Sequence, residues 1–295
     1  MIIFPNRDAV IENIKQNLAN QDYNKKVEID DPHMTSEESM RRINEYFRKR
    51  NTLLGKVKNI CARTIYQAVT WAENTNTQIV GMDNLKALDP KQGAIITSNH
   101  FNPLENTIIR RFVQRTKTHK RLFIISQDTN LGMKGLVGFL MNNLDIIPLG
   151  KSINYLGKTF PDAVKHVIDK GNYILIYPEE EMWFNYRKPR PFKRGTYYYA
   201  AKVNAPIISC FVELRDLPSF EPNSDDKIHR VQAILHVLPV IFPDSNKSVK
   251  ENSYAMMKQD YQQKKNAYEK AYGKSLTYDF SPEDIAGWVG PDKQK

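Results

Sequence analysis

The sequence contains little cysteine. Its 295 residues include 2 cysteines, Cys61 and Cys210, which lie far apart in separate apolar stretches. They do not have the short Cys/His spacing of a zinc site, and they do not make the framework of a disulfide-rich secreted domain. We therefore expect two reduced core residues in a cytoplasmic protein.

Long hydrophobic runs are also absent. The sequence nowhere offers the roughly 18 consecutive apolar residues that a membrane-spanning helix needs. Its first ten residues already carry the charges of Arg7 and Asp8, and no long apolar stretch follows them, which is unlike a secretory signal. Hydrophobic residues still make up 41% of the chain, an ordinary share for a folded protein. We expect any membrane contact to be peripheral, from the surface.

Acidic residues are scarce relative to basic ones. The sequence has 33 Asp and Glu against 43 Lys and Arg, so its net charge is +10. Such an excess favours an anionic partner, for example a phospholipid surface, a nucleotide or a nucleic acid. The imbalance is strong between Arg41 and Arg63, where eight basic residues accompany one acid, Glu45.

Residues 1–83 predict an N-terminal helical extension. A short helix is expected around residues 9–18, and a long one after Thr35, because Thr35 and Glu38 have the spacing of a capping box. Spacings of three and four along the long helix indicate one buried face, formed by Val57, Ile60, Cys61, Thr64, Ile65, Ala68, Val69 and Ala72. Two interpretations stay open: a helix packed on the main domain with a solvated basic face, and an amphipathic helix lying on anionic lipid.

The middle of the chain alternates between buried strands and helices. Six apolar runs predict strands, at residues 93–98, 121–126, 144–149, 172–177, 205–214 and 233–240. Between them lie helical stretches, at residues 104–115, 131–142, 157–170 and 195–204. This alternation predicts an α/β domain over residues 84–245, with a largely parallel central sheet flanked by helices. Residues 246–295 are expected to form a C-terminal helical tail packed on that domain.

The stretch SNHFNPLEN, residues 98–106, follows the first of these strands. Ligands bind beyond the carboxyl ends of parallel strands, and His100 and Glu105 sit at such an end. In one interpretation Glu105 completes a capping box begun by Asn102, and His100 is an ordinary loop residue. In the other, His100 is a general base whose imidazole is oriented by the Glu105 carboxylate. The pattern alone leaves both open.

Asn99, His100 and Glu105 together resemble the Asn-His-x4-Asp motif of the PlsC-type glycerolipid acyltransferase family, with Glu in place of Asp. The Glu keeps the charge and adds one methylene. Further blocks resemble the family's in the same order, over roughly residues 84–240: Lys151 at the position of the second block's Arg, Pro178 and Glu179 in the third block, Gly195 in a Phe-Lys-x-Gly run, and Pro206 in the fourth block.

The resemblance implies an O-acyltransferase of lipid metabolism and phospholipid biosynthesis. It would move a fatty acyl group from acyl-coenzyme A or acyl carrier protein to a hydroxyl of a glycerolipid or lysophospholipid, without a metal or other cofactor. His100 would be the general base and Glu105 its orienting acid. The acceptor would be bound by Lys151, Glu179, Arg187, Arg190, Lys193 and Arg194.

The third block departs from the family's Pro-Glu-Gly-Thr-Arg-Ser. Glu180 stands in place of its Gly and Met182 in place of its Arg, the residue expected to bind the acceptor's phosphate. The three adjacent carboxylates of residues 179–181 repel a phosphate, so the acceptor is expected to differ from lysophosphatidate. A divalent metal site on these carboxylates is the weaker alternative, because successive residues of an extended chain point in different directions.

Two other functions fit parts of the sequence. A lipid-binding relative that has lost catalysis would fit the altered third block. A nucleic-acid-binding protein would fit the net charge, but the sequence has no recognisable binding motif, and its aromatics lie in hydrophobic contexts rather than within a basic patch. We therefore expect an anionic membrane surface, the acyl donor and the lysolipid acceptor as partners, and no nucleic acid.

Overall fold

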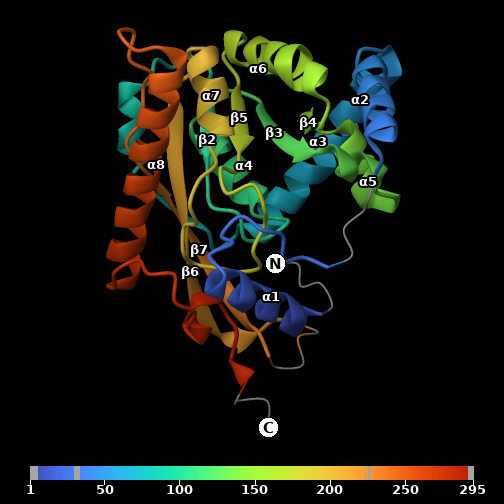
Figure 1. Cartoon of the computed structure of the whole chain (residues 1–295). Coiled ribbons are helices and arrows are strands. Elements are labelled where there is room, and N and C mark those ends of the chain that lie inside the picture. The colour runs from blue at the N-terminus through green and yellow to red at the C-terminus, as the bar shows by residue number, and fades with distance from the viewer. Residues whose placement is uncertain (1–5, 30–33, 223, 225–226, 292–295) are drawn as a thin grey trace.

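The computed structural model of the chain describes residues 6–29, 34–222, 224 and 227–291 (Figure 1). Its centre is a seven-stranded sheet in the order β1-β7-β6-β2-β5-β3-β4. All neighbouring strands run parallel except β6 and β7, so the prediction of an α/β fold with a largely parallel sheet is confirmed. The strands are β1 (Gln78–Val80), β2 (Ala94–Thr97), β3 (Leu122–Gln127), β4 (Ile146–Leu149), β5 (Tyr173–Ile176), β6 (Ile207–Phe220) and β7 (His229–Val237).

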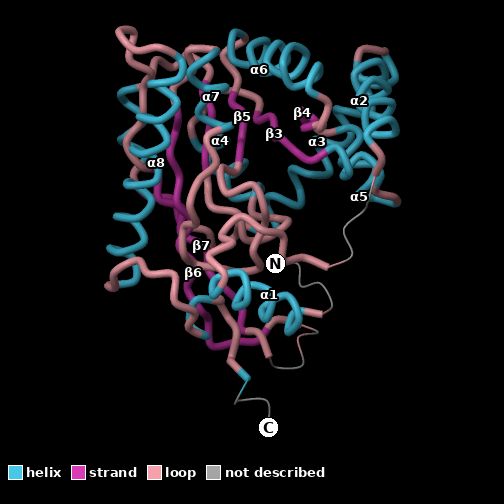
Figure 2. The backbone as a smooth tube through the Cα atoms, in the orientation of Figure 1, coloured by secondary structure: helices cyan, strands magenta, loops and turns pink. Residues whose placement is uncertain are grey.

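Eight α-helices surround the sheet within the described part of the chain (Figure 2). They are α1 (Arg7–Ala19), α2 (Ser36–Arg50), α3 (Leu53–Glu73), α4 (Asn106–Arg115), α5 (Gly135–Asn143), α6 (Phe160–Asp169), α7 (Gly195–Lys202) and α8 (Val249–Tyr272). Shorter helical segments are η1 (Met82–Ala87), η2 (Asp128–Gly132), η3 (Tyr155–Thr159) and η4 (Pro282–Asp284).

The two faces of the sheet are covered by different helices. Successive residues of a strand point to opposite faces, so Ile95 packs with Phe160 of α6 and Tyr197 of α7, while Ile96 packs with Phe112 of α4. The strands β2 and β5 at the centre are buried along their whole length, as expected for a parallel sheet covered on both sides. Strand β1, which the sequence did not predict, is a three-residue edge strand with two exposed residues.

The N-terminal extension contains two helices where the sequence predicts one long helix. The helical conformation is interrupted at Asn51 and Thr52. The Thr52 hydroxyl then caps α3 by accepting from the Gly55 amide at 3.0 Å. The turn is tight: a Cβ on Gly55 would come within 2.0 Å of the Lys49 carbonyl oxygen. The prediction is therefore wrong here, because a local cap at Thr52 ends one helix and begins another.

The predicted buried face of α3 is exposed. Val57 is 49% exposed and Ile60 is 61% exposed, and Cys61 is exposed as well, so it is not the core residue that we predicted. The opposite face of α3 packs on α4 and α5 through Asn59, Ala62, Tyr66 and Thr70. Periodicity gave the amphipathic character correctly, but polar and aromatic residues make the contact. Cys210, by contrast, is fully buried in β6.

Both ends of the chain pack on the domain, and the segment after α8 joins α1 in one apolar cluster through Ile285 and Trp288. Helix α1 packs through Ile11 and Ile14 against Trp183 and Phe184, which lie in the loop that follows β5. Helix α8 packs against α7 and β6. Among the described residues, no helix combines the length and apolar character needed to cross a bilayer.

Candidate functional site

His100 lies just beyond the carboxyl end of β2, in the loop that leads to α4. Strand β5 is the parallel neighbour of β2, with Thr97 opposite Ile176. The residues that follow the two strands therefore meet at one edge of the sheet, where α/β proteins bind ligands. This places Tyr177, Pro178 and Glu179 beside the His100 loop, as the order of the motifs along the chain suggests.

The carboxylate of Glu105 has two different partners, one for each oxygen. Its Oε1 is in very short contact with Nδ1 of His100. Its Oε2 accepts from two backbone amides, those of Phe101 and, at 2.8 Å, Asn102. The side chain is almost completely buried. One oxygen of Glu105 therefore holds the backbone of the turn, and the other contacts His100 in the geometry that an orienting acid needs.

Helix α4 begins later than the sequence predicts. Residues 103–105 form a turn and the helix starts at Asn106, so Asn102 is not the helix cap that we expected. The Asn102 side chain instead accepts from the Leu104 amide at 3.2 Å within the turn. The turn closes on itself through Asn102 and Glu105, and this closure fixes the loop that carries His100.

Chemistry decides which imidazole nitrogen of His100 carries a proton. A carboxylate oxygen accepts, so Nδ1 donates to Glu105 and Nε2 is left with its lone pair. Nε2 forms no hydrogen bond with a residue in the described part of the chain, and the side chain is 21% exposed. The imidazole therefore presents an Nε2 without a hydrogen-bond partner among the described residues at the carboxyl edge of the sheet.

Tyr177 packs directly on the imidazole, a contact that the sequence reasoning missed. The rings of Tyr177 and His100 are stacked, with centroids 4.1 Å apart and an angle of 6° between their planes. Burial, and secondarily the charge of Glu105, raises the pKa of the Tyr177 phenol well above its ordinary value. Its buried hydroxyl makes no hydrogen bond of good geometry within the described residues. The only hint of this contact in the sequence was an aromatic residue directly before Pro178, at the end of a predicted strand.

Glu179 and Arg190 form a buried ion pair. Arg190 Nη2 lies 2.9 Å from Glu179 Oε2, and the two residues are 0% and 1% exposed respectively. The same Oε2 accepts from the backbone amide of His100 at 3.2 Å. Their assignment to acceptor binding stays a prediction, but in this structure both side chains hold the loops together and neither reaches solvent.

The other predicted cations divide into paired and exposed groups. Arg187 pairs with Asp216, while Lys193 and Arg194 are exposed. The guanidinium of Arg194 lies over the ring of Tyr254, 4.6 Å from its centroid. The Lys193 backbone amide donates to the Pro178 carbonyl at 2.8 Å, which places Lys193 next to the third block.

Lys151 lies apart from His100. It follows β4, which is separated from β2 by β5 and β3. Three strand spacings amount to roughly 14 Å. Helix α2 lies over this end of β4, since a Cβ on Gly150 would come within 2.7 Å of Ile43 Cδ1. Lys151 is exposed, and the structure does not bring it together with His100.

The remaining motif residues have local structural tasks. Asn99 pairs with the backbone of Val212, donating to its carbonyl at 3.1 Å and accepting from its amide at 2.8 Å, which joins the His100 loop to β6. Pro178 and Pro206 are buried, and Gly195 is the first residue of α7. In the third block, Glu180 has a φ of +66°, a left-handed conformation that favours the glycine of the family's motif.

No group of three or more His, Cys, Asp or Glu side chains in the described residues is arranged to hold a metal ion. Glu179 is one of the three consecutive carboxylates considered for such a site, and it forms an ion pair with Arg190 instead.

The sequence was compared with models of known protein families. Residues 76–213 match the family model Acyltransferase. The match runs from just before β1 into β6, so it contains the His100 loop, the β5 end and α7, and it supports the acyltransferase family in general. It does not distinguish the PlsC-type subfamily. Helices α1–α3, strand β7 and helix α8 lie outside the Acyltransferase match, and no curated protein matches the chain.

Proposed function

We propose that this protein transfers a fatty acyl group from a thioester, acyl-coenzyme A or acyl carrier protein, to a hydroxyl of a glycerolipid or lysophospholipid. The observation that carries the proposal is the pairing of His100 with Glu105 at the carboxyl edge of the sheet, within the region that matches the Acyltransferase family.

His100 acts as the general base. Glu105 keeps the proton on Nδ1 and stabilises the imidazolium that forms, so Nε2 takes the proton of the acceptor hydroxyl. The Glu105 carboxylate is already positioned by two backbone amides, and it therefore needs no rearrangement to do this.

The acceptor oxygen attacks the thioester carbonyl as its proton moves to Nε2. The resulting tetrahedral intermediate collapses with cleavage of the carbon–sulfur bond, and the imidazolium returns its proton to the leaving thiolate. The products are an ester and a free thiol. No acyl-enzyme, metal or redox step is needed, and His100 ends in its starting state.

The acceptor is expected to differ from lysophosphatidate. Met182 replaces the arginine of the family's third block, and Arg190, the cation nearest to that block in the buried core, is already paired with Glu179. Lys193 is then the exposed cation adjoining the block, with Glu180 near it. Burial and the neighbouring Glu181 raise the pKa of the Glu180 carboxyl, while Lys193 opposes this shift. A zwitterionic lysophospholipid, glycolipid or aminolipid suits this mixture of charges better than a phosphate monoester.

The proposal is tested with a matrix of donors and acceptors. Acyl-coenzyme A and acyl carrier protein of several chain lengths are each incubated with lysophosphatidate, a zwitterionic lysophospholipid, a glycolipid and an aminolipid, all presented in vesicles. Thiol release and the acylated product are measured together. Acceptor-dependent thiol release, with the product mass increased by one acyl group, is expected for at least one pair.

Thiol release that does not depend on any acceptor contradicts the proposal and indicates hydrolysis of the thioester instead of transfer. Vesicle binding without thiol release or product contradicts it as well and supports a lipid-binding protein without catalysis. Decisive preference for DNA or RNA over anionic vesicles in salt-dependent binding also contradicts it.

A further inference from the structure

The linker segment that follows α1, residues 20–28, lies against the third-block loop, residues 177–194. We propose that Asn24 of the linker segment is a positioning residue for acyl transfer, because it holds the third-block loop against the turn that carries His100. The inference rests on the proposed function, since it concerns how the base is held. The linker segment lies outside residues 76–213, so the match to the Acyltransferase family assigns it no role.

Asn24 joins two points of the third-block loop. Its side-chain amide donates to the Glu179 carbonyl at 3.2 Å and to the Pro191 carbonyl at 2.7 Å. The amide group of asparagine has two donor hydrogens, which suffice for both bonds. One carbonyl lies near the start of the loop and the other near its end. A single side chain therefore fixes the two arms of the loop relative to each other.

The backbone of the linker segment provides acceptors for two buried donors of the same loop. Arg190 Nη1 donates to the Tyr23 carbonyl at 2.9 Å, and Trp183 Nε1 donates to the Lys25 carbonyl at 2.9 Å. Both Arg190 and Trp183 are 0% exposed, so water does not replace these acceptors. A buried donor without a partner is costly. The carbonyls of the residues on either side of Asn24 therefore keep the linker segment on the loop.

The third-block loop in turn holds both backbone polar groups of His100. The His100 amide donates to Glu179 Oε2 at 3.2 Å, and the His100 carbonyl accepts from the Trp183 amide at 3.1 Å. Arg190 Nη2 fixes the same Glu179 oxygen at 2.9 Å. Because Asn24 binds the backbone of Glu179, one residue links it to His100. A shift of the loop would therefore move the backbone that carries the imidazole.

The linker segment is itself held from two sides. Asn17 of α1 donates to the Lys25 carbonyl at 3.3 Å. The ring of Tyr23 packs on the ring of Tyr278, which follows α8, with centroids 4.5 Å apart. The Tyr278 hydroxyl also donates to the Pro189 carbonyl at 2.9 Å. Segments before and after the region of the family match therefore brace the third-block loop together, as a precisely held site requires.

Substitutions of Asn24 separate positioning from binding. Asn24→Asp has nearly the same shape but sets a carboxylate against two carbonyl oxygens. It is expected to lower kcat about tenfold or more, while KM for donor and acceptor stays within about twofold of wild type. Asn24→Ala removes the donors without adding charge, so a kcat loss of about threefold or more is expected even if Asn24→Asp does not fold. Asn24→Gln keeps the donors on a longer side chain and is expected to retain more kcat than either. Steady-state acceptor-dependent thiol release gives both constants.

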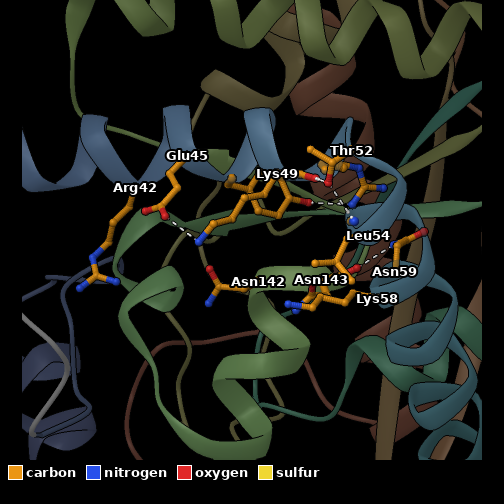
Figure 3. Close-up of a pocket in the computed structure, with 12 residues that line it drawn as sticks. Arg42, Glu45, Lys49, Thr52, Leu54, Lys58, Asn59, Asn142 and Asn143 are labelled. Atoms are coloured by element: carbon orange, nitrogen blue, oxygen red, sulfur yellow. Dashed lines mark hydrogen bonds and ion pairs between the residues drawn. The ribbon is translucent and has the colours of Figure 1, made fainter.

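Asn142 provides the matched control. Its side-chain amide also donates to two main-chain carbonyls, those of Leu131 at 3.1 Å and Gly138 at 2.9 Å. Asn142 lines a pocket of about 300 Å³ (Figure 3). The described residues that form this pocket come from α2, the turn after it, α3 and α5, and not from the third-block loop. Asn142→Asp is therefore expected to keep kcat within about twofold of wild type, although it disrupts the same kind of contact.

Hydrogen exchange of backbone amides reports the positioning without any substrate. The His100 and Trp183 amides are expected to exchange slowly in wild type, because they donate across the contact between the two loops. Asn24→Asp is expected to speed their exchange about fivefold or more, whereas Asn142→Asp leaves it unchanged. Solution NMR of the full-length chain measures both amides, and urea unfolding shows that each variant is folded.

Three results would overturn the proposal: unchanged exchange at His100 in folded Asn24 variants, wild-type kcat in those variants, or equal kcat losses in Asn24→Asp and Asn142→Asp. A raised KM with unchanged kcat would overturn it as well, since Asn24 would then act in binding. Wild type without acyl transfer would contradict the proposed function instead. Faster His100 exchange in Asn24→Asp would then still show that the linker segment holds the His100 backbone, so the two failures are distinguishable.

Discussion

The imidazole of His100 and the phenol of Tyr177 are stacked, with their ring centroids 4.1 Å apart. Tyr177 covers a face of the imidazole, while Glu105 contacts the Nδ1 edge. The backbone amide of His100 is held separately by Glu179. Two contacts, one from the end of β5 and one from the turn before α4, therefore restrict the rotation of the imidazole, and Glu179 fixes the backbone that carries it.

The stack predicts different effects for two substitutions of Tyr177. Tyr177→Phe keeps the ring and removes a buried hydroxyl that lacks a well-formed hydrogen bond, so activity within about threefold of wild type is expected. Tyr177→Leu removes the aromatic face and lets the imidazole turn, so kcat is expected to fall about tenfold or more while KM for the donor changes little. Steady-state kinetics on both variants make the comparison. Equal effects of Phe and Leu would show that the stack does not position His100.

The two-sided contact of Glu105 makes Glu105→Gln a sharp test. The amide oxygen of Gln can still accept from the backbone amides of Phe101 and Asn102, so the turn is expected to fold. The amide NH2 group cannot accept from Nδ1, so it favours the wrong tautomer of His100. A loss in kcat of about three to four orders of magnitude is expected, as for the equivalent change in acid-histidine pairs. Urea unfolding serves as the stability control, and an active Glu105→Gln enzyme would remove Glu105 from the mechanism.

Helix α8 carries a fully buried ion pair behind β2. Lys264 contacts Asp260 and donates to Thr97 at 2.8 Å, and the side chains of both members of the pair are 0% exposed. Lys264→Met leaves the Asp260 carboxylate buried without its cation, so the free energy of unfolding is expected to fall by about 3–5 kcal/mol.

A matched pair on the surface gives the control for Lys264. Lys165 and Asp169 have the same residue types and the same spacing on α6, but their side chains are 59% and 55% exposed. Lys165→Met is expected to cost no more than about 0.5 kcal/mol. Urea denaturation of both variants gives the two values, and similar losses would mean that burial does not decide the strength of the Lys264 pair.

Buried tyrosines make the protein sensitive to alkali. Burial raises the pKa of Tyr66 to about 12 and that of Tyr272 to about 12. The unfolded chain releases these protons near pH 10, while the folded chain retains them. Between these pH values the unfolded chain loses protons that the folded chain keeps, and this favours the unfolded chain. The free energy of unfolding is therefore expected to decline as pH rises from about 10 towards 12. Urea unfolding across this range tests it. Tyr66→Phe is expected to make the decline with pH less steep. An unchanged slope would mean that the Tyr66 phenol does not cause it.

The sequence predicted the sheet well because its central strands are buried and the strands beside them are also mostly apolar. Strands covered on both faces appear as unbroken apolar runs, and all six predicted runs coincide with strands β2–β7. The same logic misses β1, whose three residues lie at an exposed edge. The location of His100 and Glu105 was also predictable, because a strand end followed by a helix fixes where such residues lie.

Contacts between residues far apart in the chain could not be predicted from the sequence. Nothing local to Arg187 or Arg190 indicates that their partners are Asp216 and Glu179. The four neighbouring cations predicted to bind the acceptor therefore looked equally available to a ligand. Likewise, helical periodicity shows that α3 has two faces, but not which of them meets the domain. Stacking of Tyr177 on His100 depends on the parallel pairing of β2 and β5, which the sequence leaves unspecified.

The central claim is that His100 performs acyl transfer as a base, and its most direct test is the rate of acceptor-dependent thiol release by the His100→Ala variant. The matched control is His166→Ala, at an exposed position on α6. Release is expected to vanish in His100→Ala and to persist in His166→Ala, with both variants folded. Equal acceptor-dependent release by His100→Ala and wild type would contradict the proposed role of the His100 and Glu105 pair.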